Sequence, residues 1–205
     1  MRDGIKIMLT AVAAATLTLS ACASAPHSID TEEVSPKLSG QTYGDLMVVA
    51  VYDDRSYRVG SETAFVEELK ARGVTATVSY NDIPDLHALD DDSALRKALS
   101  SSDADAILAV ATLDEGYDYD YGDYLETRGI VYLLGGQPGA GTDMGSFISW
   151  AGSGSYQLYV GLWDAKTLEP VWQITTNSQS SGSESEDLKT LADFTVESLR
   201  ERGLI

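Results

Sequence analysis

The sequence predicts a single α/β domain, and three features of its pattern support that prediction. From residue 45 onward, short apolar runs alternate with helix-like segments, as in a parallel sheet with crossover helices. Two alternating segments within residues 156–176 predict a β-hairpin, and a periodic segment near the end of the chain predicts a helix. A length of 205 residues fits one domain.

The first strand, helix and second strand are expected between residues 46 and 80. Residues 46–51 form an uninterrupted apolar run, typical of a strand buried on both faces. Ser61 is expected to cap the helix that follows, and Gly73 to end it. Residues 74–80 then alternate apolar and polar, as in a strand nearer the edge of a sheet.

A second helix and a third strand complete a β-α-β-α-β unit. Leu95, Ala98 and Leu99 form the apolar stripe of the helix, and residues 106–111 are again fully apolar. Because crossovers between parallel strands are right-handed, the unit is expected to have the strand order 2-1-3.

The second half of the domain is expected to extend this sheet. Residues 129–134 predict a short strand, and residues 156–163 and 171–176 predict a hairpin that turns at residues 164–167. Trp163 and Trp172 flank that turn and are expected to pack across strands or against the last helix.

A capping box is expected to begin the last helix, because Ser183 is followed three residues later by Glu186. The side chains expected on its buried face are Leu188, Leu191, Ala192, Thr195 and Leu199.

Charge and cysteine content exclude several function classes. The chain has 14 basic and 32 acidic side chains and a formal charge of −18, which would repel the phosphates of a nucleic acid. A single cysteine excludes an internal disulfide framework and any CxxC-type metal or redox site. We expect no cofactor.

The amino terminus has the pattern of a secretory signal. Arg2 and Lys6 precede an uncharged run over residues 7–21, which is too short to span a membrane. The run ends in Leu19-Ser20-Ala21-Cys22, which resembles the lipobox of bacterial lipoproteins. The alternative is that Cys22 is an ordinary small residue near a signal cleavage site.

The lipobox resemblance implies an address and a division of the chain. Residues 1–21 would be the signal peptide, residues 22–43 the lipidated Cys22 with a flexible tether, and residues 44–205 the α/β domain. Ala23 stands where an Asp would imply retention in the inner membrane, so the resemblance implies the outer membrane, with the domain facing the periplasm. Several acyl chains on Cys22 would hold the protein on the membrane.

Four features of the globular part are distinctive: Arg58 and Glu62 after the first strand, Ser79-Tyr80, Asp105-Ala106-Ile107-Leu108, and the hairpin from Leu162-Trp163-Asp164 to Val171-Trp172. In these features it resembles a family of uncharacterised bacterial periplasmic lipoproteins and, more loosely, the amino-terminal domain of TolB-type proteins. The resemblance implies a compartment and a fold, and no reaction.

A binding site is expected beyond the carboxyl ends of the parallel strands, where ligands gather in open α/β sheets. Tyr and Arg are favoured anchors of binding sites. The candidate residues in the loops after the first and third strands are Asp53, Asp54, Arg55, Tyr57, Arg58, Tyr117, Tyr119, Tyr121 and Tyr124. The alternative is that Arg55 or Arg58 pairs with nearby acids and that the tyrosines only cover the sheet edge.

A calcium site formed by Asp118, Asp120 and Asp123 is a weaker hypothesis. These residues supply the oxygen ligands that calcium prefers, but their spacing does not fit an EF-hand loop. A solvated acidic loop is the favoured interpretation.

We expect a non-catalytic domain that binds another envelope protein. The alternatives are a module that binds glycan, peptidoglycan or a small ligand, and a hydrolase. The hydrolase would depend on His87, because His27 lies in the expected tether.

Overall fold

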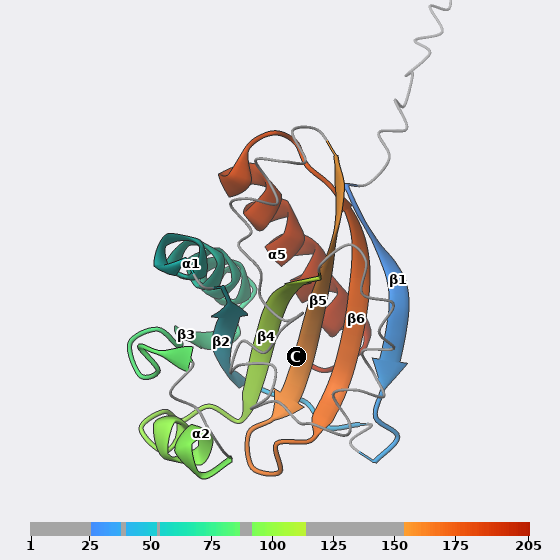
Figure 1. The fold of residues 1–205 in the computed structure, drawn as a ribbon. Coiled ribbons are helices and arrows are strands. Elements are labelled where there is room, and N and C mark those ends of the chain that lie inside the picture. Colours follow the sequence, from blue (N-terminus) through green and yellow to red (C-terminus); the bar gives the residue numbers. More distant parts are fainter. Residues whose placement is uncertain (1–25, 38–39, 53, 87–91, 114–153) are drawn as a thin grey trace, which may run out of the picture.

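The computed structural model describes residues 26–37, 40–52, 54–86, 92–113 and 154–205 (Figure 1). The elements in chain order are β1 (His27–Val34), β2 (Asp45–Val51), α1 (Arg55–Ala71), β3 (Thr75–Val78), α2 (Asp92–Leu99), β4 (Ala106–Leu113), β5 (Ser155–Asp164), β6 (Pro170–Gln179) and α5 (Glu184–Glu201). Within these ranges, six strands form one sheet in the order β1-β6-β5-β4-β2-β3.

The predicted α/β domain is confirmed. Strand β2 pairs in parallel with β3 on one side and with β4 on the other, which is the predicted order 2-1-3. Strands β5 and β6 form the predicted hairpin, and the antiparallel pairs β4–β5, β5–β6 and β6–β1 extend the sheet. The strand expected at residues 129–134 lies outside the described residues.

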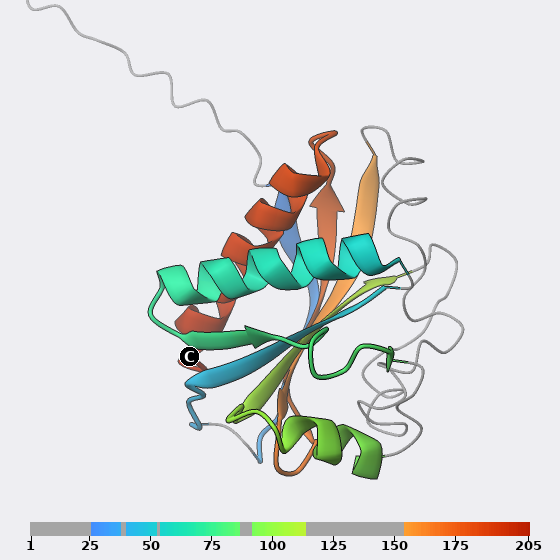
Figure 2. The same ribbon diagram turned by 90° about the vertical axis from the view of Figure 1, so that its left-hand side faces the viewer.

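The sheet has a core on each face. On one face, Leu69 of α1 and Leu191 of α5 belong to the same buried cluster as Trp172. On the other face, Leu95 of α2 shares a cluster with Trp163 (Figure 2). Trp172 therefore packs in the core beneath the last helix, as expected, whereas Trp163 lies on the opposite face.

The predicted start of α1 is wrong. The helix begins at Arg55, and Asp54 caps it by accepting the Ser56 N–H at 2.6 Å. Ser61 is buried within the helix. The first turns of α1 bury the polar residues Arg58, Ser61 and Glu62, so the sequence there lacks the apolar periodicity from which a helix is predicted. The end is as predicted, since Gly73 has a φ of +82° and its N–H donates to the Lys70 carbonyl at 3.0 Å.

The position of the N-cap of α5 is as predicted, but the predicted capping hydrogen bond is not formed. Ser183 is the capping residue, but its side chain makes no capping hydrogen bond. The buried Asp187 instead accepts the Ser181 N–H and the Ser180 hydroxyl, both at 2.7 Å. The loop before α5 is thus fastened by a carboxylate of the first helical turn.

Residues His27–Val34, which were expected in the tether, instead form β1 along β6. An edge strand that is largely open to solvent lacks the apolar alternation by which buried strands are recognised. Ile29 is 38% exposed and Val34 is 42% exposed, and acidic residues separate them. Among these acids, Glu32 accepts the Trp172 indole N–H at 2.8 Å.

Candidate functional site

Five strand ends meet at one edge of the sheet, which we call the Pro26 edge. They are the start of β1, the ends of β2 and β4, the start of β5 and the end of β6 (Figure 1, upper part). The register pairs that align them are Leu113 with Gln157, Ser155 with Gln179, and His27 with Ser178. The Gln179 N–H also donates to the Pro26 carbonyl at 2.8 Å. The carboxyl ends of β2 and β4 therefore lie at the edge where β1 begins.

Three of the predicted site residues lie directly after β2 at this edge. Asp54 and Arg55 are exposed, and the Asp54 carboxylate also caps α1. Tyr57 is half-buried and packs against a cluster formed by Ala50, Tyr52 and Leu188. Arg55 forms no ion pair with any of the described residues, so its exposed guanidinium is available to a partner.

Arg58 does not lie on the binding surface expected for it. Its side chain is only 5% exposed in total, and its Nε donates to Oε1 of Glu62 at 2.9 Å. Its Nη2 donates to the Ser79 hydroxyl and to the Ile83 carbonyl, both at 2.7 Å. For Arg58, the alternative of an ion pair with a nearby acid is the one that the structure supports.

Glu62 completes this buried ion pair. Its side chain is fully buried and accepts the main-chain N–H groups of Ala50, Ser79 and Tyr80 at 3.3, 2.6 and 3.0 Å. The Arg58–Glu62 pair therefore joins α1 to β2 and to the segment after β3. Because each charge is hydrogen-bonded by its partner and by the backbone, the pair acts as an internal fastening.

Several sequence predictions fall outside the described residues. They are the lipidation of Cys22, the roles of Asp53, Tyr117, Tyr119, Tyr121 and Tyr124, the calcium candidates Asp118, Asp120 and Asp123, and the role of His87. Within the described ranges, no group of three or more His, Cys, Asp or Glu side chains could hold a metal ion. No helix in those ranges is long and apolar enough to cross a membrane.

The structure reveals a buried histidine that sequence reasoning placed in the tether. The Nδ1 of His27 shares a hydrogen bond of 2.9 Å with the Ser178 hydroxyl, and its Nε2 shares one of 2.9 Å with the Thr190 hydroxyl. The His27 ring also lies 5.7 Å from that of Phe194. These contacts fasten the first residue of β1 to β6 and α5. The sequence around His27 lacks the apolar alternation from which a strand, and so the burial of His27, could have been predicted.

The environment of His27 favours the neutral form of the ring. Burial lowers the pKa of His27 below its usual 6.5, and the nearby Asp187 carboxylate opposes part of that shift. A neutral histidine bonded to a serine is the pairing used by nucleophilic enzymes. Ser178 is fully buried, however, and His27 is only 3% exposed, so this pair is closed to a substrate in the structure.

Several grooves lie elsewhere on the described surface, and two of them are considered next. The first, which we call the α1–α5 groove, has a volume of 880 Å³. Its lining residues are Gly60, Thr63, Ala64, Glu67, Glu68 and Ala71 of α1, and Ser183, Glu184, Ser185, Leu188 and Lys189 at the start of α5. Burial and the neighbouring Asp54 carboxylate raise the pKa of Glu184 above its ordinary value.

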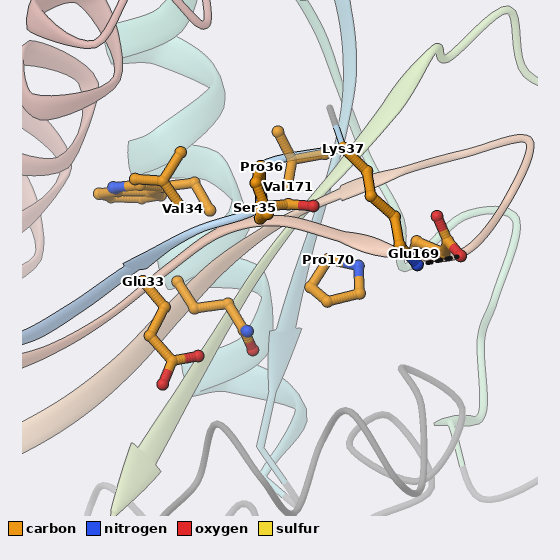
Figure 3. A pocket seen from close by; sticks show the side chains of 10 residues that line it. Glu33, Val34, Ser35, Pro36, Lys37, Glu169, Pro170 and Val171 are labelled. Carbon is orange, nitrogen blue, oxygen red and sulfur yellow. Dashed lines mark ion pairs between the residues drawn. The ribbon is translucent and has the colours of Figure 1, made fainter. Parts of the chain in front are cut away.

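The second groove lies between the end of β1 and the start of β6, at the edge of the sheet opposite Pro26 (Figure 3). It has a volume of 380 Å³ and runs past Lys37 and Glu169, whose charged atoms are 3.7 Å apart. Both side chains are substantially exposed, and such an ion pair contributes at most about 1 kcal/mol. Among the described residues that line this groove, none has a buried side-chain nitrogen or oxygen without a hydrogen-bond partner.

Comparison with known proteins gives only distant structural similarity. No known protein family and no curated protein matches the chain. Among solved structures, the chain is similar to the PelC dodecamer from Paraburkholderia phytofirmans, with 13% identity, a TM-score of 0.45, and coverage of 84% of this chain and 96% of that one. It is also similar to lipoprotein GNA1162 from Neisseria meningitidis, with 12% identity, a TM-score of 0.41, and coverage of 77% and 99%. This distant structural resemblance establishes no molecular function.

Proposed function

We propose that this protein is a non-catalytic lipoprotein of the bacterial envelope, anchored in the outer membrane through Cys22, that binds another envelope protein at its Pro26 edge. The observation that supports this most strongly is topological. The start of β1, which follows the lipobox-like sequence, lies at the same edge as the carboxyl ends of β2 and β4.

The distance from the anchor to the folded domain is short. Three residues, 23–25, separate Cys22 from Pro26, whose carbonyl is already bonded to β6. Four residue steps of fully extended chain reach at most about 14 Å. A lipid on Cys22 would therefore hold the Pro26 edge close to the membrane surface, where other anchored proteins are within reach.

The chemistry of this edge suits a protein partner. The exposed Arg55 guanidinium and the half-buried Tyr57 ring are the side-chain types that most often anchor protein interfaces. A chain with a charge of −18 gains little from anionic lipid headgroups, so we assign membrane attachment to the lipid and partner binding to the folded edge.

The His27–Ser178 pair is closed, because the hydrogen bonds of His27 join it to two hydroxyls inside the protein. A hydrolase that used this particular pair would need it to open toward a substrate. His87, on which the hydrolase alternative depends, lies outside the described residues.

In-cell photo-crosslinking tests the proposal. A photoreactive residue in place of Arg55 is compared with one in place of Lys166, which lies in the exposed turn at the opposite edge. We expect a discrete protein adduct from position 55 that is absent from position 166. Adducts with peptidoglycan only would contradict the proposal and favour the glycan-binding alternative, and equal protein adducts from both positions would also contradict it.

A further inference from the structure

We propose that the α1–α5 groove is a docking site for an amphipathic helix of the partner, apolar on one face and bordered by Lys or Arg. This inference rests on the proposed function, because it describes the chemistry of the partner. Three features of the groove support it: its shape, its charge and its position next to the Pro26 edge.

The shape of the groove fits a third helix. It lies between two neighbouring helices, and its volume of 880 Å³ falls within the range of binding pockets, about 300–1,000 Å³. Gly60 and Ala64, one helical turn apart on α1, face the buried Leu188 of α5. A Cβ on Gly60 would lie 3.8 Å from Leu188 Cδ1, so the floor is close-packed beneath the opening. Small side chains on the wall let an apolar helix face approach closely.

The charge of the groove favours a basic occupant. Glu67 and Glu184 line it, and neither forms an ion pair with another of the described residues. The third carboxylate of the lining, Glu68, is already paired with Arg72 at 2.7 Å. Lys189 is the one basic side chain among the described lining residues.

A second acidic neighbour strengthens this charge argument. Asp54 is close enough to Glu184 to help raise the pKa of that carboxyl. Glu184, Glu186 and Asp187 all lie in the first turn of α5, where acids interact favourably with the helix dipole. Dipole stabilisation of α5 does not account for Glu67, which lies on α1. A Lys or Arg of the partner would relieve the repulsion between Asp54 and Glu184.

The position of the groove places it near the anchored edge. Helix α5 begins at Glu184, five residues after β6 ends at the Pro26 edge, and the first turns of α5 form one wall of the groove. A helix that extends from a membrane-bound partner would therefore meet this groove close to the membrane surface.

Peptide binding to the full chain in phosphatidylcholine nanodiscs tests the inference. The probe is a dye-labelled helical peptide of about 18 residues with Leu on one face and Lys on the other, a length near that of α1. The matched peptide carries Glu in place of Lys, and empty nanodiscs give the background. We expect the Lys peptide to bind at least about tenfold more tightly than the Glu peptide, as measured by fluorescence anisotropy.

Variants distinguish the groove from general attraction to an acidic protein. Ala64→Arg places bulk and positive charge on the floor, and the pair Glu67→Gln with Glu184→Gln removes two charges from the wall. Each should weaken binding of the Lys peptide by about tenfold. The control pair Asp103→Asn with Glu201→Gln makes the same charge change at exposed positions away from the groove and should leave affinity within about twofold.

Three results would overturn the inference. They are equal loss of affinity in the control pair, equal binding of the Glu peptide, and self-association of the protein that Ala64→Arg abolishes, which would make a second copy the occupant. The two Gln substitutions keep the test valid if Ala64→Arg does not fold. If crosslinking from position 55 captures a protein but the groove variants do not weaken binding of the Lys peptide, the docking inference fails while the proposed function stands.

Discussion

Arg58 and Glu62 lie one helical turn apart on α1, and their side chains form a buried ion pair with 2.9 Å between Nε and Oε1. Glu62 also accepts the N–H groups of Ala50 and Ser79, so the pair links the helix to β2 and to the segment after β3. Removal of one partner leaves an uncompensated charge in the protein interior, which costs far more than the loss of an exposed ion pair.

The first prediction concerns this pair. Arg58→Ala should lower the free energy of unfolding by about 3–5 kcal/mol, because the Glu62 carboxylate loses its buried counter-charge. Arg55→Ala, at an exposed position three residues earlier, should change it by less than about 0.5 kcal/mol. Urea unfolding of the two variants checks both values. Equal effects of the two substitutions would contradict the structural role assigned to Arg58.

The second prediction concerns pH and His27, whose pKa is lowered by burial. Below the usual pKa of 6.5, the unfolded chain binds a proton at His27 before the folded chain does. The free energy of unfolding should therefore decrease as the pH falls below 6.5 and level off below the folded pKa. Above 6.5 the ring is neutral in both states and adds no pH dependence.

The matched variant for this effect is His27→Gln, which keeps a polar side chain but does not titrate. The stability advantage of the unaltered protein over His27→Gln should shrink between about pH 7.5 and about pH 5.5 in urea unfolding. An advantage that is constant, or that grows in acid, would show that His27 is not held neutral by the fold.

The third prediction concerns Glu184, whose pKa is raised above 4.5 by burial first and by Asp54 second. The folded state therefore keeps this proton longer than the unfolded state, and the contribution to stability is lost as the pH rises from 4.5 through the folded pKa. Asp54→Asn retains a side-chain oxygen to cap α1 and removes the charge.

An NMR titration of the Glu184 side-chain carboxyl in the Asp54→Asn variant measures the effect. The pKa of Glu184 should decrease toward its ordinary value without reaching it, because burial remains. An unchanged pKa would show that the two carboxylates do not interact, and would remove one of the charge arguments for the α1–α5 groove.

The fourth prediction compares two glycines. A Cβ on Gly161 of β5 would lie 2.3 Å from the Tyr159 hydroxyl oxygen and 2.8 Å from Trp163 Nε1. Tyr159 cannot easily move away, because it is buried and donates to Gln173 at 2.8 Å. Gly161→Ala should therefore lower the free energy of unfolding by about 1–3 kcal/mol.

The matched substitution is Gly60→Ala on α1, where the added Cβ meets only Leu188 at an ordinary distance of 3.8 Å. Alanine is the better helix former, so this change should raise the free energy of unfolding by up to about 1 kcal/mol. Thermal unfolding of the two variants should shift in opposite directions. A shift in the same direction would contradict the packing described around one of these positions.

The parallel core and the hairpin were predictable because buried strands are continuous apolar runs. Residues 46–51 and 106–111 pair as β2 and β4, and Asp164 begins the predicted hairpin turn, where its carboxylate accepts the Thr167 N–H at 2.8 Å. Strand β1 was missed because an exposed edge strand tolerates acids along its length. Its attachment at His27 depends on partners about 150 residues later in the chain.

The candidate site was predictable only in part, for a related reason. The rule that ligands gather at strand ends located Asp54, Arg55 and Tyr57 at the correct edge. The same rule could not show that Arg58, unlike these three residues, is buried. An Arg four residues before a Glu on a helix gives the same sequence pattern whether the ion pair is exposed or buried. Burial at that position depends on β3 and the segment after it.

If Cys22 is lipidated, the Pro26 edge should face the membrane. This orientation can be measured by the quenching, by lipids with a headgroup nitroxide, of a fluorophore placed at Ser155 or at Lys166 in the membrane-anchored full chain. We expect stronger quenching at Ser155, and loss of the difference when about 20 Gly and Ser residues are inserted before Pro26. Equal quenching at the two positions, or stronger quenching at Lys166, would contradict it.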